Sequence, residues 1–167
     1  MPFSLFGRNK KDNTAVKILA PMSGKVVDLA EVPDKVFSAK IVGDGIAVEP
    51  SEGVVVAPFD GLVKQVFPTG HAVVVESKGG LLLLIHIGID TVNLKGEGFK
   101  ILVSEGRTVR TGTPLVKFDM EIIKGKGFPL VSPIVIPEMT LVERINSSGL
   151  EKVEKGRDLL MEVFLKR

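Results

Sequence analysis

The sequence contains no cysteine, tryptophan or tyrosine, and only two of its 167 residues are histidines. Without cysteine there is no disulfide, no thiol nucleophile and no cysteine-ligated metal, as is usual for a protein of the reducing cytoplasm. Residues 1–17 hold four of the 22 basic side chains and one of the 20 acidic ones, so the rest of the chain is nearly neutral. Nucleic-acid binding needs a basic face and often stacking rings, so we expect none here.

Long apolar runs are also missing. The longest, LLLLI at 81–85, is too short to span a bilayer, and the first residues lack the apolar segment of a signal peptide. We therefore expect a cytoplasmic protein with a flexible basic tail over residues 1–15 and one domain over 16–167. Phe3, Leu5 and Phe6 beside the lysines of the tail predict at most weak membrane contact.

Short runs rich in Val, Ile and Leu alternate with Gly, Pro, Asp and Ser along the chain. This pattern predicts an all-β protein, an antiparallel sandwich or barrel of many short strands. Helical turns are expected only at 119–125, with Asp119 as N-cap, and around 32–37. The echo between APMSGKVV at 20–27 and APFDGLVK at 57–64 predicts pseudo-repeated halves, with SPIVI at 132–136 as a degenerate third copy that opens an edge strand.

Both histidines flank one β-prone segment, HAVVVESKGGLLLLIH at 71–86. If the segment is a hairpin closed by a two- or four-residue loop, His71 lies directly opposite His86, with Cβ atoms about 4.5–5.5 Å apart. A three-residue loop would shift the register by one and turn the imidazoles to opposite faces. The pairing of the two histidines is therefore conditional on the length of the loop.

Three chemistries can use such a pair. Zinc hydrolysis needs a third protein ligand. Asp60 and Asp90 are the candidates for it, but the sequence contains no recognisable zinc motif. A general acid and base pair would need a substrate pocket that the sequence does not identify. Phosphoryl transfer through phosphohistidine needs no nucleotide site, and no phosphate-binding glycine motif is present.

Several segments resemble one family. GGLLLLIHIGIDTVNLKGEGF at 79–99, FPTGHAVVVES at 67–77, EVPDKVFSAKIVGDGIAVEPSEG at 31–53 and APFDGLV at 57–63 are similar, in the family's order, to glucose-type enzyme IIA proteins of the bacterial phosphoenolpyruvate:sugar phosphotransferase system. The likeness runs from about residue 16 to the C-terminus. It implies an antiparallel β-sandwich, which agrees with the strand pattern.

The resemblance also implies roles for single residues. His86 matches the histidine that carries the phosphoryl group, His71 the second active-site histidine, and Thr69 a hydroxyl that orients the second imidazole. Gly88 gives access to the backbone beside His86 for a carbonyl or N–H contact, and it is counted with the partner surface. The implied partner surface combines two acidic positions with an apolar rim, and its residues are Asp34, Asp90, Val36, Phe37, Ile41, Val42 and Phe67. From the sequence alone, Phe37 and Phe67 also fit a core position and Asp34 a turn.

Two positions depart from the family pattern. Gly70 stands between Thr69 and His71, where a larger polar residue is expected, and Leu84 stands where some relatives carry an aromatic ring. Neither removes the chemistry, and both bear on partner preference.

The leading hypothesis is a phosphoryl carrier that accepts the group on His86 from the histidine-containing phosphocarrier protein and passes it to a sugar-specific IIB domain. No cofactor or resident metal is expected, although a zinc ion held with a partner's carboxylate would be another use of His71 and His86. A second hypothesis is a regulatory module that binds targets according to its phosphorylation state. A third, a metallopeptidase-like or lipoyl-type domain, lacks the third ligand or the modifiable lysine.

Overall fold

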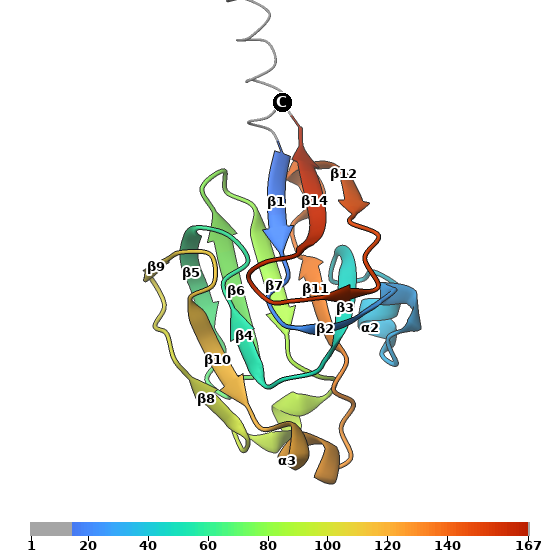
Figure 1. Ribbon diagram of the computed structural model, residues 1–167, viewed down its shortest axis with the longest axis vertical. Coiled ribbons are helices and arrows are strands. Elements are labelled where there is room, and N and C mark those ends of the chain that lie inside the picture. The colour runs from blue at the N-terminus through green and yellow to red at the C-terminus, as the bar shows by residue number, and fades with distance from the viewer. Residues whose placement is uncertain (1–14, 167) are drawn as a thin grey trace, which may run out of the picture.

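The computed structural model describes residues 15–166, and its strands form three sheets in which every pairing is antiparallel (Figure 1). The largest sheet has eight strands. In spatial order these are β13 (Lys152–Val153), β2 (Gly24–Val27), β3 (Asp44–Pro50), β11 (Ser132–Ile136), β7 (Leu82–His86), β6 (Ala72–Ser77), β5 (Gly61–Val66) and β9 (Thr108–Val109).

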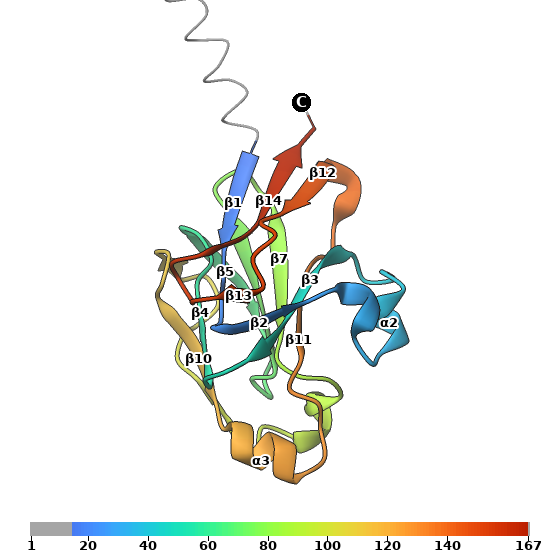
Figure 2. The same ribbon diagram turned by 45° about the vertical axis from the view of Figure 1, so that its right-hand side comes forward.

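Two sheets of three strands complete the sandwich, and Figures 1 and 2 show them against the large sheet at the top and at the lower left. They are β1 (Ala15–Leu19), β14 (Leu159–Leu165) and β12 (Val142–Ser147), and β4 (Val54–Val56), β10 (Pro114–Phe118) and β8 (Phe99–Ile101). The expected antiparallel β-sandwich is thus confirmed.

Within residues 15–166 the helical elements are short, with three to six residues each. Asp119 accepts hydrogen bonds from the backbone N–H groups of Glu121 and Ile122 at 3.0 and 3.2 Å, as expected of the N-cap at 119. The region 32–37 contains an α-helical turn, which Asp34 caps. The helical elements are η1 (Leu29–Glu31), α2 (Lys35–Ser38), η2 (Thr91–Leu94), α3 (Met120–Gly125) and η3 (Met139–Leu141).

The two echoed segments occupy equivalent places near the two ends of the large sheet. Gly24 of β2 pairs with Val153 of β13, and Gly61 of β5 pairs with Val109 of β9. The expectation for SPIVI is wrong, because β11 lies in the middle of the sheet between β3 and β7. Its proline is tolerated there because β7 pairs only with Ile134 and Val135, beyond Pro133.

The hydrophobic core consists of two clusters. The larger lies between the sheets and includes Leu83 and Ile85 of β7. The smaller contains Leu29, Phe37 and Val135 and packs against Leu84. Because side chains alternate along a strand, His86 shares the face of Leu84 and lies on the side of the smaller cluster.

The β6–β7 hairpin takes the register of a three-residue loop. His86 pairs with Ala72, because the hairpin closes with a three-residue loop at 78–80. Gly80 takes a φ of +90° there, as in a turn followed by a left-handed residue. The condition for placing His71 directly opposite His86 is therefore not met, and the register is shifted by one position, as expected for a three-residue loop.

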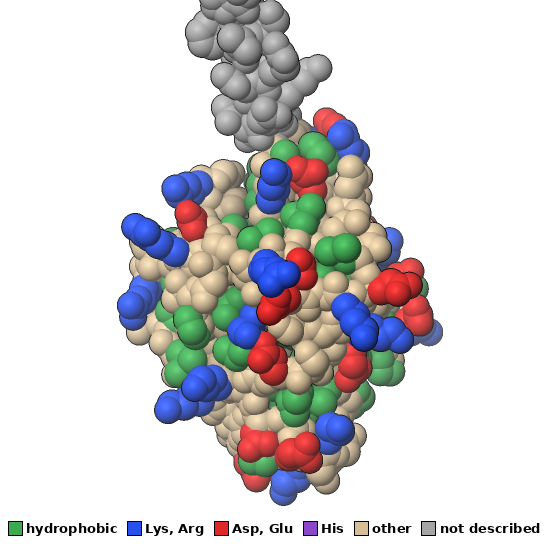
Figure 3. Space-filling model, in the orientation of Figure 1, with side chains coloured by type: hydrophobic (Ala, Val, Ile, Leu, Met, Phe, Trp, Pro, Cys, Tyr) green, Lys and Arg blue, Asp and Glu red, His purple; other side chains and the backbone are tan. Residues whose placement is uncertain are grey.

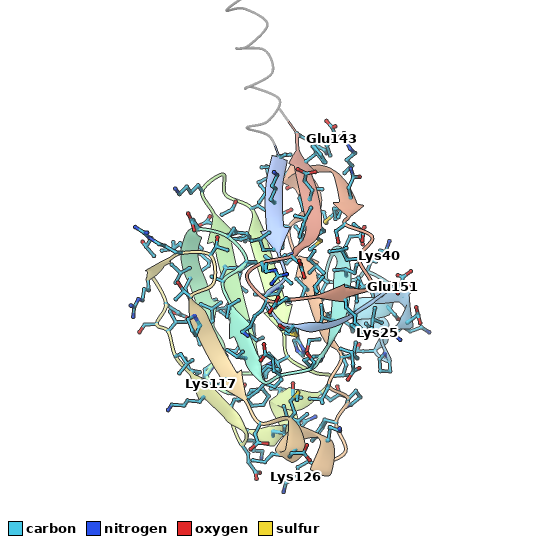
Figure 4. All side chains as sticks on the ribbon, in the orientation of Figure 1. Lys25, Lys40, Lys117, Lys126, Glu143 and Glu151 are labelled. Carbon is cyan, nitrogen blue, oxygen red and sulfur yellow. The ribbon has the colours of Figure 1, made fainter. Side chains whose placement is uncertain are left out.

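The surface carries charges of both signs. Figure 3 shows Lys, Arg, Asp and Glu side chains interspersed over one face, and the six charged residues labelled in Figure 4 are all exposed. Between residues 15 and 166, the molecule has no helix with the length and apolar character needed to cross a membrane. Nearly all of the expected basic tail, and its proposed membrane contact, lies outside the described residues.

Candidate active site

His86 ends β7, and its ring is held by the chain that follows it. Its Nδ1 lies 2.8 Å from the carbonyl oxygen of Gly88. A carbonyl oxygen can only accept a hydrogen bond, so Nδ1 carries the hydrogen in the neutral ring. Nε2 therefore keeps its lone pair and is the nucleophilic nitrogen of this imidazole.

His71 is almost completely buried, with 6 % of its surface exposed. Its Nδ1 is hydrogen-bonded to Oγ1 of Thr69, and the ring of Phe67 meets it edge-on at 5.3 Å between centroids. The hydrogen bond orients the ring and leaves Nε2 as its second polar atom.

The structure brings the two imidazoles together despite the shifted register, so the expectation that a three-residue loop turns them to opposite faces is wrong. Their centroids lie 5.1 Å apart and the rings cross at 78°. The backbone N–H of Ile87 also donates to the carbonyl oxygen of His71 at 2.7 Å. His71 precedes the first residue of β6, after Gly70 with a φ of +76°, so its side chain does not follow the alternation of the strand.

Both imidazoles are neutral at pH 7. Burial, and secondarily the neighbouring His86, lower the pKa of His71 to about 4. Burial also lowers the pKa of His86, while the Gly88 carbonyl and the charges of Asp34 and Asp90 oppose that shift. A neutral imidazole is the form that can act as a nucleophile.

An apolar rim adjoins the histidines. Phe37 is buried in the smaller cluster and places its ring 5.0 Å from that of His86, so it belongs to the core and to the site at once. Val36 and Ile41 are 43 % and 68 % exposed, which is unusual for large apolar side chains. Val42 is half-buried against the smaller cluster, and half-buried Phe67 continues the rim beside His71.

The two acidic positions lie at element termini. Asp34 accepts a hydrogen bond from the backbone N–H of Val36 at 2.8 Å and so caps α2. Asp90 precedes η2, is exposed and has a φ of +60°. That left-handed conformation is uncommon for a residue with a side chain and typical of functional loops.

The structure explains why glycine occupies position 70. A Cβ atom there would lie 2.9 Å from Cβ of Phe99, and the φ is left-handed. A larger residue would require β8 to move away. Leu84, the other departure, fills the face of β7 that packs on the smaller cluster.

The donor set for zinc hydrolysis is not assembled. Asp60 accepts hydrogen bonds from Thr111 at 2.8 and 3.1 Å. Over residues 15–166, no three His, Cys, Asp or Glu side chains converge on a metal position.

Two further groups beside His86 were not predicted from the sequence. Ser132 and Thr91 are both fully buried, and their hydroxyls contact the backbone of Gly88 and Ile87. Ser132 could have been singled out from the sequence, because it is a polar residue within the otherwise apolar run LVSPIVI.

Comparison with known proteins gives consistent results. Residues 16–142 match the family described as phosphoenolpyruvate-dependent sugar phosphotransferase system, EIIA 1. The chain is 42 % identical over 159 residues to the "PTS system glucose-specific EIIA component" of Staphylococcus epidermidis, covering 95 % of this chain and 96 % of that one. It is 51 % identical over 149 residues to the "PTS system glucoside-specific EIICBA component" of Staphylococcus carnosus, covering 86 % of this chain and 21 % of that protein.

Among solved structures, the glucose permease IIA from Mycoplasma capricolum superimposes with a TM-score of 0.81. Its sequence is 33 % identical, and the match covers 90 % of this chain and 97 % of that one.

Proposed function

This chain belongs to the EIIA 1 family of the phosphoenolpyruvate-dependent sugar phosphotransferase system, and is thus a phosphoryl carrier in sugar uptake, and we propose that His86 is the residue that carries the phosphoryl group. The observation that carries the proposal is the hydrogen bond from Nδ1 of His86 to the Gly88 carbonyl, which leaves Nε2 free to attack. In the transfer, the Nε2 lone pair forms the new bond to phosphorus. The electron pair of the broken P–N bond returns to the donor imidazole.

His71 would assist without becoming phosphorylated. If the hydroxyl of Thr69 donates to Nδ1 of His71, the hydrogen of that neutral ring is on Nε2. Such an Nε2–H group, 5.1 Å from the other ring by centroid, can donate to a phosphoryl oxygen on His86. Positioned hydrogen bonds of this kind stabilise the charge of a phosphoryl group as it transfers.

The donor and the acceptor are the finer part of the proposal. The donor is the histidine-containing phosphocarrier protein, and the acceptor is a cysteine of a sugar-specific IIB domain. The exposed side chains of Val36 and Ile41, beside Asp34 and Asp90, support a docking face around His86 because apolar patches ringed by charge bind protein partners. No diffusible cofactor is required, and we propose no resident metal.

The family and its relatives support two further proposals, on the location and on the sugar. We propose that this carrier works in the cytoplasm, where it would meet the phosphocarrier protein and a IIB domain. The named relatives include a glucose-specific and a glucoside-specific protein, so we propose that the sugar is glucose or a glucoside.

The test is an intact-mass spectrum after incubation with phosphoenolpyruvate, enzyme I and the phosphocarrier protein. Wild type should gain one acid-labile phosphoryl group, and His86→Gln should gain none. His71→Gln should still be phosphorylated but should transfer the group to a IIB domain slowly. Uptake by His86→Gln, or no uptake by wild type while a known carrier in the same mixture is phosphorylated, would refute the proposal.

A regulatory role is favoured by one observation: His86 lies within the same exposed apolar rim. A phosphoryl group placed there adds up to two negative charges to a docking face. Pull-downs with phosphorylated and unphosphorylated protein should capture different sets of partners, and identical sets would remove this role.

A further inference from the structure

The peptide unit between Ile87 and Gly88 is held on both sides by buried hydroxyl groups. Thr91 donates its hydroxyl hydrogen to the carbonyl oxygen of Ile87, and the N–H of Gly88 donates to Oγ of Ser132 at 3.0 Å. Both hydroxyl residues have no exposed surface. Because a peptide unit is planar, bonds to its two polar groups fix its rotation.

A second hydrogen bond of Ser132 shows that its hydroxyl oxygen accepts the N–H of Gly88. The hydroxyl of Ser132 donates to the carbonyl oxygen of Leu130 at 2.8 Å. Its single hydrogen is thereby used, and a lone pair is left for the N–H of Gly88. Ser132 belongs to β11, a strand of five buried residues in the middle of the large sheet, so this support is rigid.

The carbonyl of Gly88 belongs to the next peptide unit, whose N–H, that of Ile89, donates to the carbonyl oxygen of Pro129 at 3.1 Å. The clamped Ile87–Gly88 peptide fixes the nitrogen side of Gly88, so the two units together set the direction of this carbonyl. Gly88 has a φ of +70°, and a Cβ atom there would lie 2.7 Å from Cγ2 of Thr91 and 2.8 Å from the carbonyl oxygen of Pro129. The residue is therefore enclosed, and its carbonyl oxygen is held 2.8 Å from Nδ1 of His86.

We propose that Ser132 and Thr91 are positioning residues for phosphoryl transfer: by clamping the Ile87–Gly88 peptide they keep His86 in the tautomer whose Nε2 is unprotonated. This inference rests on the proposed function of His86. Neither hydroxyl touches the phosphoryl group. Each acts through the backbone, as outer groups do when they fix the tautomer and orientation of a functional histidine.

Loss of the clamp has a specific chemical consequence. If the Ile87–Gly88 peptide can rotate, Gly88 is held only on its carbonyl side. Its carbonyl oxygen then no longer stays at Nδ1 of His86 in every molecule, and a fraction of the rings place the hydrogen on Nε2. That form has no lone pair on Nε2 and cannot attack phosphorus there. We expect the rate of phosphoryl acceptance to fall about ten-fold, the lower range for removing an outer supporting group.

The test compares Ser132→Ala and Thr91→Val with Ser77→Ala. Ser77 is a matched control, because its buried hydroxyl also accepts a backbone N–H, that of Leu81 at 3.1 Å, but at the turn end of the hairpin. Nitrogen-15 NMR of the imidazoles reports the tautomer in unphosphorylated protein. A phosphorylation assay quenched at successive times reports the rate of phosphoryl acceptance.

We expect wild type and Ser77→Ala to show a single Nδ1–H tautomer at His86, and Ser132→Ala and Thr91→Val to show a mixture with slower acceptance. A single Nδ1–H tautomer in both clamp variants, or the same mixture in Ser77→Ala, would overturn the inference. The tautomer measurement needs no phosphoryl donor. Failure of wild type to accept a phosphoryl group would therefore refute the proposed function separately, while the clamp is judged on the NMR spectra.

Discussion

The rings of His71 and His86 lie 5.1 Å apart and cross at 78°, although the cross-strand partner of His86 is Ala72. Their meeting depends on the chain outside the ladder. Gly70 turns the backbone ahead of β6, and Thr69 holds the ring of His71 from that turn. The site is therefore built where a strand begins, and the pairing within the hairpin alone would not produce it.

The first prediction concerns the acid titration of His71. Its pKa of about 4 in the folded protein is below the value near 6.5 of the unfolded chain. The unfolded state therefore binds more protons between these values, and stability falls as the pH drops from 6.5 to 4. The loss amounts to at most about 3.4 kcal/mol, since each pKa unit corresponds to about 1.36 kcal/mol.

Chemical denaturation at several pH values measures this dependence, and NMR titration measures the pKa itself. His86 also has a lowered pKa, so His71→Gln should reduce the slope between pH 6.5 and 4 without abolishing it. A His71 resonance that titrates near pH 6.5 in the folded protein would show that the ring is not desolvated as the structure indicates.

The second prediction concerns the same ring after phosphorylation. A phosphoryl group on His86 replaces a neutral neighbour with up to two negative charges, so the pKa of His71 should rise above about 4. The nitrogen-15 and carbon-bound proton shifts of His71, followed against pH in the two states, measure the change. An unchanged titration would mean that His71 does not contact the phosphoryl group.

Much of the architecture could be predicted from the sequence because it depends on local signals. Val- and Ile-rich runs predicted strands, Asp119 predicted a helix N-cap, and the paired echo at Gly24 and Gly61 corresponds to equivalent strand pairings. The hairpin register stayed open because SKGG permits loops of two, three or four residues. The hydrogen bond from the N–H of Ser77 to the carbonyl of Leu81 and the left-handed φ of Gly80 show that three residues form the loop.

The rest of the site depends on contacts between distant segments. Ser132 meets Gly88 across 44 positions of the chain, which no local pattern encodes. The sequence left open whether Phe37 is a core residue or part of the partner surface. In the structure it packs in the smaller core cluster and also contacts the ring of His86.

The third prediction concerns Gly88→Ala. The added methyl group would lie 2.7 Å from Cγ2 of Thr91 and 2.8 Å from the Pro129 carbonyl, in a left-handed backbone conformation. We expect a loss of about 3 kcal/mol in the free energy of unfolding, together with slower phosphoryl acceptance.

Gly149→Ala is the control, because Gly149 has a φ of +80° and a Cβ atom there would meet nothing within 4 Å. Gly149→Ala should lower the free energy of unfolding by about 1 kcal/mol, because alanine disfavours the left-handed backbone conformation. The rate of phosphoryl acceptance should not change. Equal losses in the two variants, measured by urea denaturation, would contradict the close packing described around Gly88.

The last prediction concerns the docking face. Ile41 is 68 % exposed, so Ile41→Ser should change the free energy of unfolding by less than about 0.5 kcal/mol. If this side chain is buried by the phosphocarrier protein, its loss should raise the half-saturating concentration of that protein about ten-fold, with little change in the maximal rate. Leu141→Ser is the matched control, since Leu141 is 45 % exposed and its carbonyl pairs with Lys166 near the C-terminus. Steady-state phosphorylation at varied concentrations of the phosphocarrier protein compares Ile41→Ser with Leu141→Ser. Equal half-saturating concentrations in the two variants would place the docking face elsewhere.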